Sequence, residues 1–181
     1  MKPRLYKGEG VVISRMNYGE GDRILTVYSR DYGKLSLMAK AVRKLNSRKR
    51  GAVEIFTLIK FSAARGKTLD TVTEAVSIDS FDLLRTDLKK ASVAFFVMET
   101  LERLTREEER NDEMYDYLIS SLKELEKTSK LTTFRKNFIE KSLIILGFWP
   151  KSKGMKDHDR VLESVTERGM STVRVGKKLL A

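Results

Sequence analysis

The sequence predicts an α+β protein in which a small β-barrel precedes a bundle of helices. Apolar and polar residues alternate with a period of two through much of residues 1–79, and the spacing becomes helical near Ser80. The chain also has 36 Lys and Arg against 25 Asp and Glu, a net charge of +11, and no cysteine. We therefore expect two domains, at residues 1–79 and 80–181, and a polyanion as the partner of this basic chain.

Five strands are expected in the first domain. Glycine-containing turns with Gly19, Gly21 and Gly33 separate the first three strands, because glycine tolerates positive φ. A turn at Arg65-Gly66-Lys67 separates the last two. The expected strands are residues 10–16, 23–29, 34–41, 53–61 and 68–75. Five strands with one long connection are typical of an OB-fold barrel, and a small SH3-like barrel would give a similar pattern.

The third expected strand has one apolar face and one polar face. Leu35, Leu37 and Ala39 alternate with polar or flexible residues, so this row should face the core. Lys34 and Lys40 fall on the opposite face, where we expect both lysines to be presented to solvent.

Positive charge peaks just after this strand. No acid interrupts residues 32–53, and Asn46, Ser47 and Gly51 favour a long mobile loop. Such a loop beside a lysine-bearing strand has the layout of a phosphate-tracking groove; a purely solvated loop and an acidic membrane surface are the alternatives. The expected contacts to a phosphate backbone are Lys40, Arg43, Lys44, Arg48, Lys49 and Arg50.

Three tyrosines near these strands are candidates for stacking on nucleic-acid bases. Tyr18, Tyr28 and Tyr32 lie at or beside the turns of the first domain, and aromatic side chains on OB-fold surfaces stack on bases. Alternatively, Tyr28 belongs to the barrel core, while Tyr18 and Tyr32 pack over turns.

Helical spacing begins after Ser80, which is a candidate N-cap. In the first long helix, Ala91, Ala94, Phe95, Met98, Leu101 and Leu104 should form the buried stripe. The third helix has apolar residues on more than one stripe, so we expect it at the centre of the bundle, and Gly147 should end it. The expected helices are residues 89–106, a helix capped by Asn111, residues 131–146 and residues 157–168.

The sequence gives little support for catalysis, and we expect no enzyme activity, cofactor or metal. The absence of cysteine excludes disulfides and thiolate metal sites. His158 lies between Asp157 and Asp159, an arrangement more typical of a helix cap than of a metal site. The acids at 107–109, with Asp112 and Glu113, could hold a divalent ion for nuclease chemistry but are more typical of a solvated corner. The sequence has no apolar run long enough to predict a membrane helix and no leader that predicts secretion, so we expect a cytoplasmic protein.

Several short motifs resemble, in order and spacing, the opening of the DNA repair protein RecO family. They are Tyr18-Gly19-Glu20-Gly21-Asp22-Arg23, Ile24-Leu25-Thr26, Tyr32-Gly33-Lys34-Leu35 and Ala39-Lys40, followed by a basic segment. The resemblance favours the OB-fold. It implies a recombination mediator that binds single-stranded and double-stranded DNA, anneals complementary strands, and acts with RecR and single-stranded DNA-binding protein on the bacterial nucleoid. Arg23 and Lys34 become secondary DNA-binding candidates.

The resemblance also implies a partner site in the helical domain. RecO-like helical domains accept the acidic, Phe-ended tail of single-stranded DNA-binding protein in an apolar pocket with a basic rim. Here the candidates are Arg135, Lys136, Phe138, Ile139 and Lys141. Family members commonly carry zinc-binding cysteines after the helix that ends near Gly147, whereas this chain has the Lys-rich residues 151–156 and resembles a short form without them. An OB-fold interaction module, an RNA-binding protein and a nuclease are the alternative functions.

Overall fold

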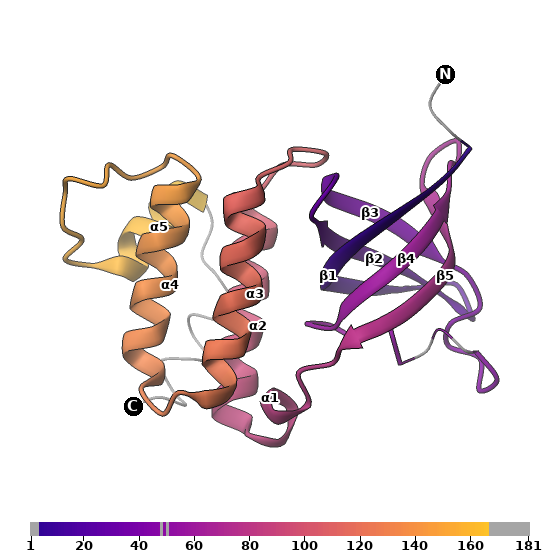
Figure 1. Ribbon diagram of the computed structural model, residues 1–181, viewed down its shortest axis with the longest axis horizontal. Helices are drawn as coiled ribbons and strands as arrows, with labels where there is room; N and C mark the ends of the chain where they lie inside the picture. Colours follow the sequence, from indigo (N-terminus) through magenta and orange to yellow (C-terminus); the bar gives the residue numbers. More distant parts are fainter. Residues whose placement is uncertain (1–3, 48, 50, 167–181) are drawn as a thin grey trace. The chain divides into compact units, whose positions relative to one another are not determined.

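The structure is a computed structural model that describes residues 4–47, 49 and 51–166 (Figure 1). It contains two compact units. The barrel unit comprises Met1–Ser80 and Arg106–Asp112, and the helical unit comprises Phe81–Thr105 and Glu113–Ala181. Nothing in the sequence pattern indicates that Arg106–Asp112, which follow a helix in the chain, belong with the barrel.

The barrel unit is a closed five-stranded barrel with the strand order β1-β2-β3-β5-β4. Neighbouring strands are antiparallel except β3 and β5, which pair in parallel at Leu37–Asp70 and Met38–Thr71. This five-stranded closure, followed by helices, confirms the α+β class and the OB-fold barrel. The strands are β1 (Leu5–Tyr18), β2 (Asp22–Ser29), β3 (Gly33–Ala39), β4 (Leu58–Ala64) and β5 (Asp70–Asp79).

The barrel core follows the alternation of β3. Leu35, Leu37 and Ala39 are buried in one cluster with residues from all five strands, as predicted. Lys40 is exposed on the other face, also as predicted. The expectation that Lys34 is presented to solvent is wrong: Lys34 is only 9% exposed. The backbone of Glu107 and Glu108 pairs with Lys34, so this end of β3 is covered.

The connection between β3 and β4 is tied to the barrel. The predicted strand at 53–61 starts too early, because residues 51–56 form turns and β4 begins only at Leu58. Val42, Ala52 and Val53 are buried in the barrel core. The described part of this connection is therefore a series of anchored turns rather than the mobile loop that was expected.

The helical unit contains five helices among the described residues. Ser80 does not cap the first helix: the N-cap position is Phe81, which has a φ of 47° and makes no side-chain capping bond. Instead, Asp87 caps the next helix by accepting hydrogen bonds from the backbone amides of Lys89 and Lys90 at 2.9 and 3.1 Å. The helices are α1 (Asp82–Thr86), α2 (Leu88–Leu104), α3 (Asp112–Lys127), α4 (Leu131–Ile145) and α5 (His158–Thr166).

The bundle is organised around α2 rather than α4, contrary to the prediction. α2 contacts α1, α4 and α5, and its buried residues extend around most of the helix. Phe96 is buried, whereas Phe95, which the predicted stripe contains, is 43% exposed. Gly147, with a φ of 77°, follows the end of α4 as predicted. Residues 167–168 of the last expected helix lie outside the described residues, and none of the described helices has the length and hydropathy needed to cross a membrane.

Candidate nucleic-acid interface

A groove of about 450 Å³ lies on the outer surface of the barrel unit. Its lining comes from the ends of β1, β2 and β3, from the turn between β4 and β5, and from Thr71 at the start of β5. The faces of β2 and β3 and the loops beside them are where OB-folds bind oligonucleotides. This groove is therefore the first place to look for a binding site.

The floor of the groove contains Ile24 and Met38, which belong to an apolar row that crosses three strands. Met16 of β1 pairs with Ile24 of β2, Ile24 pairs with Met38 of β3, and Met38 pairs with Thr71. The adjacent residues Leu25 and Leu37 point into the core, so the row is forced outward by the strand period of two. Met16 is 59% exposed. Such a row offers a surface on which the apolar face of a base can lie.

A rigid turn forms one wall of the groove. Asp70 accepts hydrogen bonds from the Tyr6 hydroxyl at 2.7 Å, the Arg65 guanidinium at 3.0 Å and the Gly66 amide at 3.0 Å. The Arg65 guanidinium also lies 4.3 Å from the centre of the Tyr6 ring. A Cβ at Gly66 would lie 1.9 Å from the Leu69 carbonyl oxygen, so the turn requires glycine there. We call Tyr6, Arg65 and Asp70 the turn clasp.

These contacts shift the pKa values of two members of the turn clasp, Asp70 and Tyr6. Partial burial opposes ionisation of Asp70, but the hydrogen bonds from Tyr6, Gly66 and Arg65 outweigh it and lower the pKa of this carboxyl. Burial, together with the hydrogen bond to Asp70, raises the pKa of the Tyr6 hydroxyl well above its ordinary value. Tyr6 therefore remains a neutral donor to an ionised carboxylate at neutral pH.

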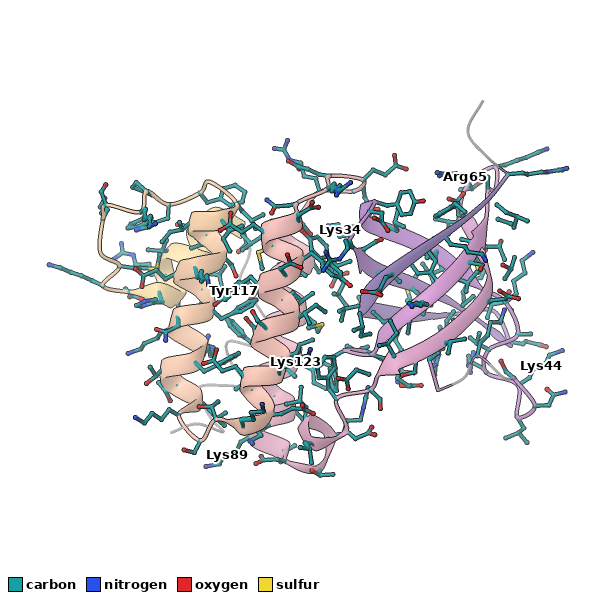
Figure 2. The ribbon with its side chains drawn as sticks, in the orientation of Figure 1. Lys34, Lys44, Arg65, Lys89, Tyr117 and Lys123 are labelled. Atoms are coloured by element: carbon teal, nitrogen blue, oxygen red, sulfur yellow. The ribbon has the colours of Figure 1, made fainter. Side chains whose placement is uncertain are left out.

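Cations lie at the groove and around the neighbouring turn between β1 and β2. Lys40 and Lys67 line the groove. Arg43 donates from its guanidinium to the Gly19 carbonyl and from its amide to the Gly21 carbonyl, both at 3.0 Å, which folds the basic connection over that turn. Lys44 is exposed beside it (Figure 2). We call Lys40, Arg43, Lys44 and Lys67 the basic rim.

Other predicted cations lie elsewhere. Lys49 donates from its amine to the Val72 carbonyl at 3.0 Å, a contact that fastens the connection to β5. Arg23 donates to Glu54 at 3.0 Å, and its side chain is only 14% exposed. Lys34 is buried at the opposite end of β3 from Lys40. Arg48 and Arg50 lie outside the described residues.

The three candidate tyrosines have different environments. Tyr18 is 53% exposed and lines the groove, so it can stack on a base. Tyr28 is fully buried, and this burial, with Glu109 and Asp112 nearby, raises the pKa of Tyr28 to about 12. Stacking by Tyr28 is thus excluded in this conformation. The Tyr32 ring packs edge-on against Tyr6 at 5.0 Å, and its hydroxyl donates to the Lys7 carbonyl at 3.2 Å.

Sequence reasoning missed the groove floor and the turn beside it. The strand period places Met38 on the same outer face of β3 as Lys40, where its apolar side chain is part of the groove. The signal was present: Met16 and Ile24 also fall on outward positions of a sheet whose inner positions are apolar. Lys67 and Leu69 carried no such signal, because only the closure of the barrel brings their turn beside β3.

The helical unit has a different groove, of about 400 Å³, between α3 and α4. Of the five predicted partner-site residues, only Lys141 lines it. Phe138 and Ile139 are fully buried, which contradicts their expected place in an open pocket. Arg135 forms an ion pair with Asp159 at 2.6 Å, and Lys136 is exposed. The groove is lined by Tyr117, Glu124, Phe134, Asn137, Glu140, Lys141 and Ile144.

The residues considered for metal binding have structural roles. Asp157 accepts a hydrogen bond from the Arg160 amide at 3.1 Å, as expected of a cap at the start of α5. His158 lies 3.3 Å from a Glu140 carboxylate oxygen. Asp112 binds Arg110 at 2.6 Å. Within the part of the chain that the structure describes, no three His, Asp or Glu residues are grouped so that they could hold a metal ion.

Comparison with known proteins covers both units. Residues 1–81 match the model of the family "Recombination protein O N terminal", and residues 85–153 match "Recombination protein O C terminal". Curated relatives named DNA repair protein RecO include one from Pelotomaculum thermopropionicum, 42% identical over 120 residues, which are 66% of this chain and 47% of the relative. A second, from Dehalococcoides mccartyi, is 35% identical over 150 residues, 83% of this chain and 59% of the relative.

A third relative, from a Roseiflexus species, is 31% identical over 168 residues, which are 93% of this chain and 59% of the relative. The chain thus spans 47% to 59% of the length of these relatives. The two family matches together cover most of the chain. The N-terminal match covers the observed barrel, and the C-terminal match covers most of the helices that follow it. This chain belongs to the RecO family of recombination proteins.

Proposed function

We propose that the barrel unit binds DNA by laying a single strand over the groove beside β2 and β3, and that the protein acts in recombinational DNA repair. The observation that carries this proposal is the outward apolar row Met16–Ile24–Met38, which lies next to an exposed tyrosine and the basic rim. A surface that only faces solvent needs no such apolar row, whereas single-stranded DNA with unstacked bases needs a surface on which the bases can lie.

In this proposal, different side chains serve the phosphates and the bases. Lys40, Lys44 and Lys67 neutralise phosphates, and Arg43 adds charge while holding the connection on the turn at Gly19. Tyr18 stacks on one base, a contact worth about 1–3 kcal/mol, and Met38 supports the next. Arg48 and Arg50 remain predicted contacts from the sequence.

We further propose that the protein binds single-stranded and double-stranded DNA, anneals complementary strands, and works with RecR and single-stranded DNA-binding protein, as the family implies. A cationic surface holds two polyanions together and screens their repulsion while the bases remain free to pair. This activity requires neither nucleotide hydrolysis nor a cofactor, so the proposed role is that of a mediator rather than an enzyme. In the helical unit, Lys136 and Lys141 are the remaining candidates for contacting an acidic partner tail.

The direct test replaces two cations of the basic rim. Lys40→Gln with Lys44→Gln should weaken binding to a single-stranded oligonucleotide and reduce the log–log slope of affinity against salt by about 1.4, because each lost phosphate contact contributes about 0.7. Fluorescence anisotropy at several salt concentrations measures this slope, and the rate at which complementary fluorescent strands pair measures annealing.

The matched control is Lys123→Gln with Lys127→Gln, which removes the same total charge from two exposed lysines of the helical unit. A folded rim variant with the slope of the control would contradict the rim assignment. Tighter binding to RNA than to DNA would favour the RNA-binding alternative. Recruitment of RecR without any DNA binding at low salt would favour the interaction module.

A further inference from the structure

A short acidic segment covers one end of the sheet face on which the proposed DNA site lies. Arg106–Asp112 contain Glu107, Glu108 and Glu109 in succession, and this acidic segment belongs to the barrel unit. The side chains of all three glutamates are exposed. Their charge is opposite to that of the basic rim, which lies at the other end of β3.

Backbone pairing attaches the acidic segment to the edge of β3. The Glu108 amide donates to the Lys34 carbonyl at 2.9 Å, and Glu107 forms a parallel β-bridge with Lys34. The Ser36 hydroxyl donates to a Glu107 carboxylate oxygen at 3.2 Å. The pairing of β3 with β5 begins only at Leu37, so the acidic segment occupies the edge of β3 that β5 leaves open.

The start of β3 is shaped for this close contact. Gly33 has a φ of 67°, and a Cβ there would lie 2.2 Å from the Glu109 carbonyl oxygen, so no other residue fits without displacing the segment. Lys34 and its cross-strand neighbour Tyr28 are 9% and 0% exposed. This half of the β2–β3 face is therefore closed, while the half with Ile24 and Met38 borders the groove.

We propose that the acidic segment sets the end of the DNA track: it blocks the Lys34 end of the β2–β3 face and confines a bound strand to the end with Met38 and Lys40. This inference rests on the proposed function. The segment acts in two ways, because its backbone fills the edge of β3 and its carboxylates repel phosphates that approach from the groove. The bound strand is consequently short, in the lower part of the roughly 4–16 nucleotides that an OB-fold covers.

The test neutralises the segment without removing its contacts. Glu107→Gln with Glu109→Gln keeps an oxygen acceptor for Ser36 and leaves the backbone pairing in place. We expect this variant to bind oligo-dT about fivefold more tightly at low salt. The Glu107 carboxylate accepts a hydrogen bond from Ser36, two residues before Met38, so its charge acts on a strand bound at Met38 through a screened Coulomb interaction. The gain should shrink as salt is added.

The control is Glu124→Gln with Glu163→Gln, which makes the same change in net charge on exposed positions of the helical unit. We expect it to alter affinity less than twofold. A second variant, Gly33→Ala, should displace the segment and lengthen the shortest oligo-dT that reaches full affinity. Circular dichroism establishes that each variant is folded, and if Gly33→Ala fails to fold, the charge variant decides alone.

The outcomes separate this inference from the function on which it rests. If Lys40→Gln with Lys44→Gln weakens binding but Glu107→Gln with Glu109→Gln behaves like its control, the track-end role is overturned and the proposed DNA site stands. If the lysine variant and wild type bind equally, the site itself is wrong. The inference is supported if Glu107→Gln with Glu109→Gln binds more tightly in a salt-sensitive way while Glu124→Gln with Glu163→Gln does not.

Discussion

At the scale of single residues, Asp70 accepts three hydrogen bonds within the barrel unit. It joins Tyr6 on β1 to Arg65 and Gly66 in the turn between β4 and β5, which forms one wall of the groove. Hydrogen bonds to an ionised carboxylate contribute more than neutral ones, about 1.5–3 kcal/mol each at most. The turn clasp therefore couples barrel stability to the shape of the groove.

Asp70→Asn should lower the free energy of unfolding by about 1–3 kcal/mol at pH 7, because Tyr6 and Arg65 lose a charged acceptor. The folded-state pKa of Asp70 is lowered, so its stabilisation is present above the ordinary carboxyl pKa and is lost as pH falls through the folded value. Urea unfolding at neutral and at strongly acidic pH measures both effects. An equal gap between wild type and variant at the two pH values would contradict this role.

At the scale of elements, the row across β1, β2 and β3 links strand register to base binding. Tyr18 ends β1 and lies at the groove, while the register that buries Leu25 turns Ile24 outward. A shift of one residue in this pairing would move the apolar floor into the core. The proposed binding of bases would thus follow from the same alternation that builds the barrel.

Tyr18→Ala should weaken binding to single-stranded DNA by about 1–3 kcal/mol and leave the salt slope unchanged, because a stacking contact is lost and no phosphate contact is. Tyr32→Phe is the control, since it keeps the ring packed on Tyr6 and removes only a hydroxyl that donates to Lys7. Anisotropy titrations over a range of salt concentrations test this. An altered slope would show that Tyr18 acts on the backbone instead.

The strands and helices also show which parts of the fold the sequence pattern predicts. The period-two pattern predicted the buried row of β3, and Gly147 predicted the end of α4. The pattern misplaced the start of β4, because Val53 and Phe56 are buried from turns rather than from a strand. Apolar residues in a turn that packs on the core give the same local signal as a strand.

The candidate site was less predictable for a physical reason. Lys34 is covered by pairing with Glu107, and Arg23 is held in an ion pair with Glu54. Both partners are distant in sequence. No local pattern reveals such a contact. The same holds for Lys67, which reaches the groove only because β5 closes the barrel beside β3.

At the scale of the whole molecule, most of the net positive charge is carried by the barrel part of the sequence, where residues 1–80 contain 16 Lys and Arg against 8 Asp and Glu. The acidic segment comes from outside this range but belongs to the same unit. The barrel unit thus combines a basic rim at one end of β3 with an acidic boundary at the other. This polarity favours one position for a bound strand over the rest of the barrel surface.

The most direct measurement is an NMR titration of the ¹⁵N-labelled protein with a short oligo-dT at low salt. The amides of Tyr18, Ile24, Met38, Lys40 and residues 66–69 should show the largest shifts, because they surround the groove. Shifts centred instead on Lys7, Lys60 and Val76, which line a separate groove of about 450 Å³ on the barrel, would contradict the account.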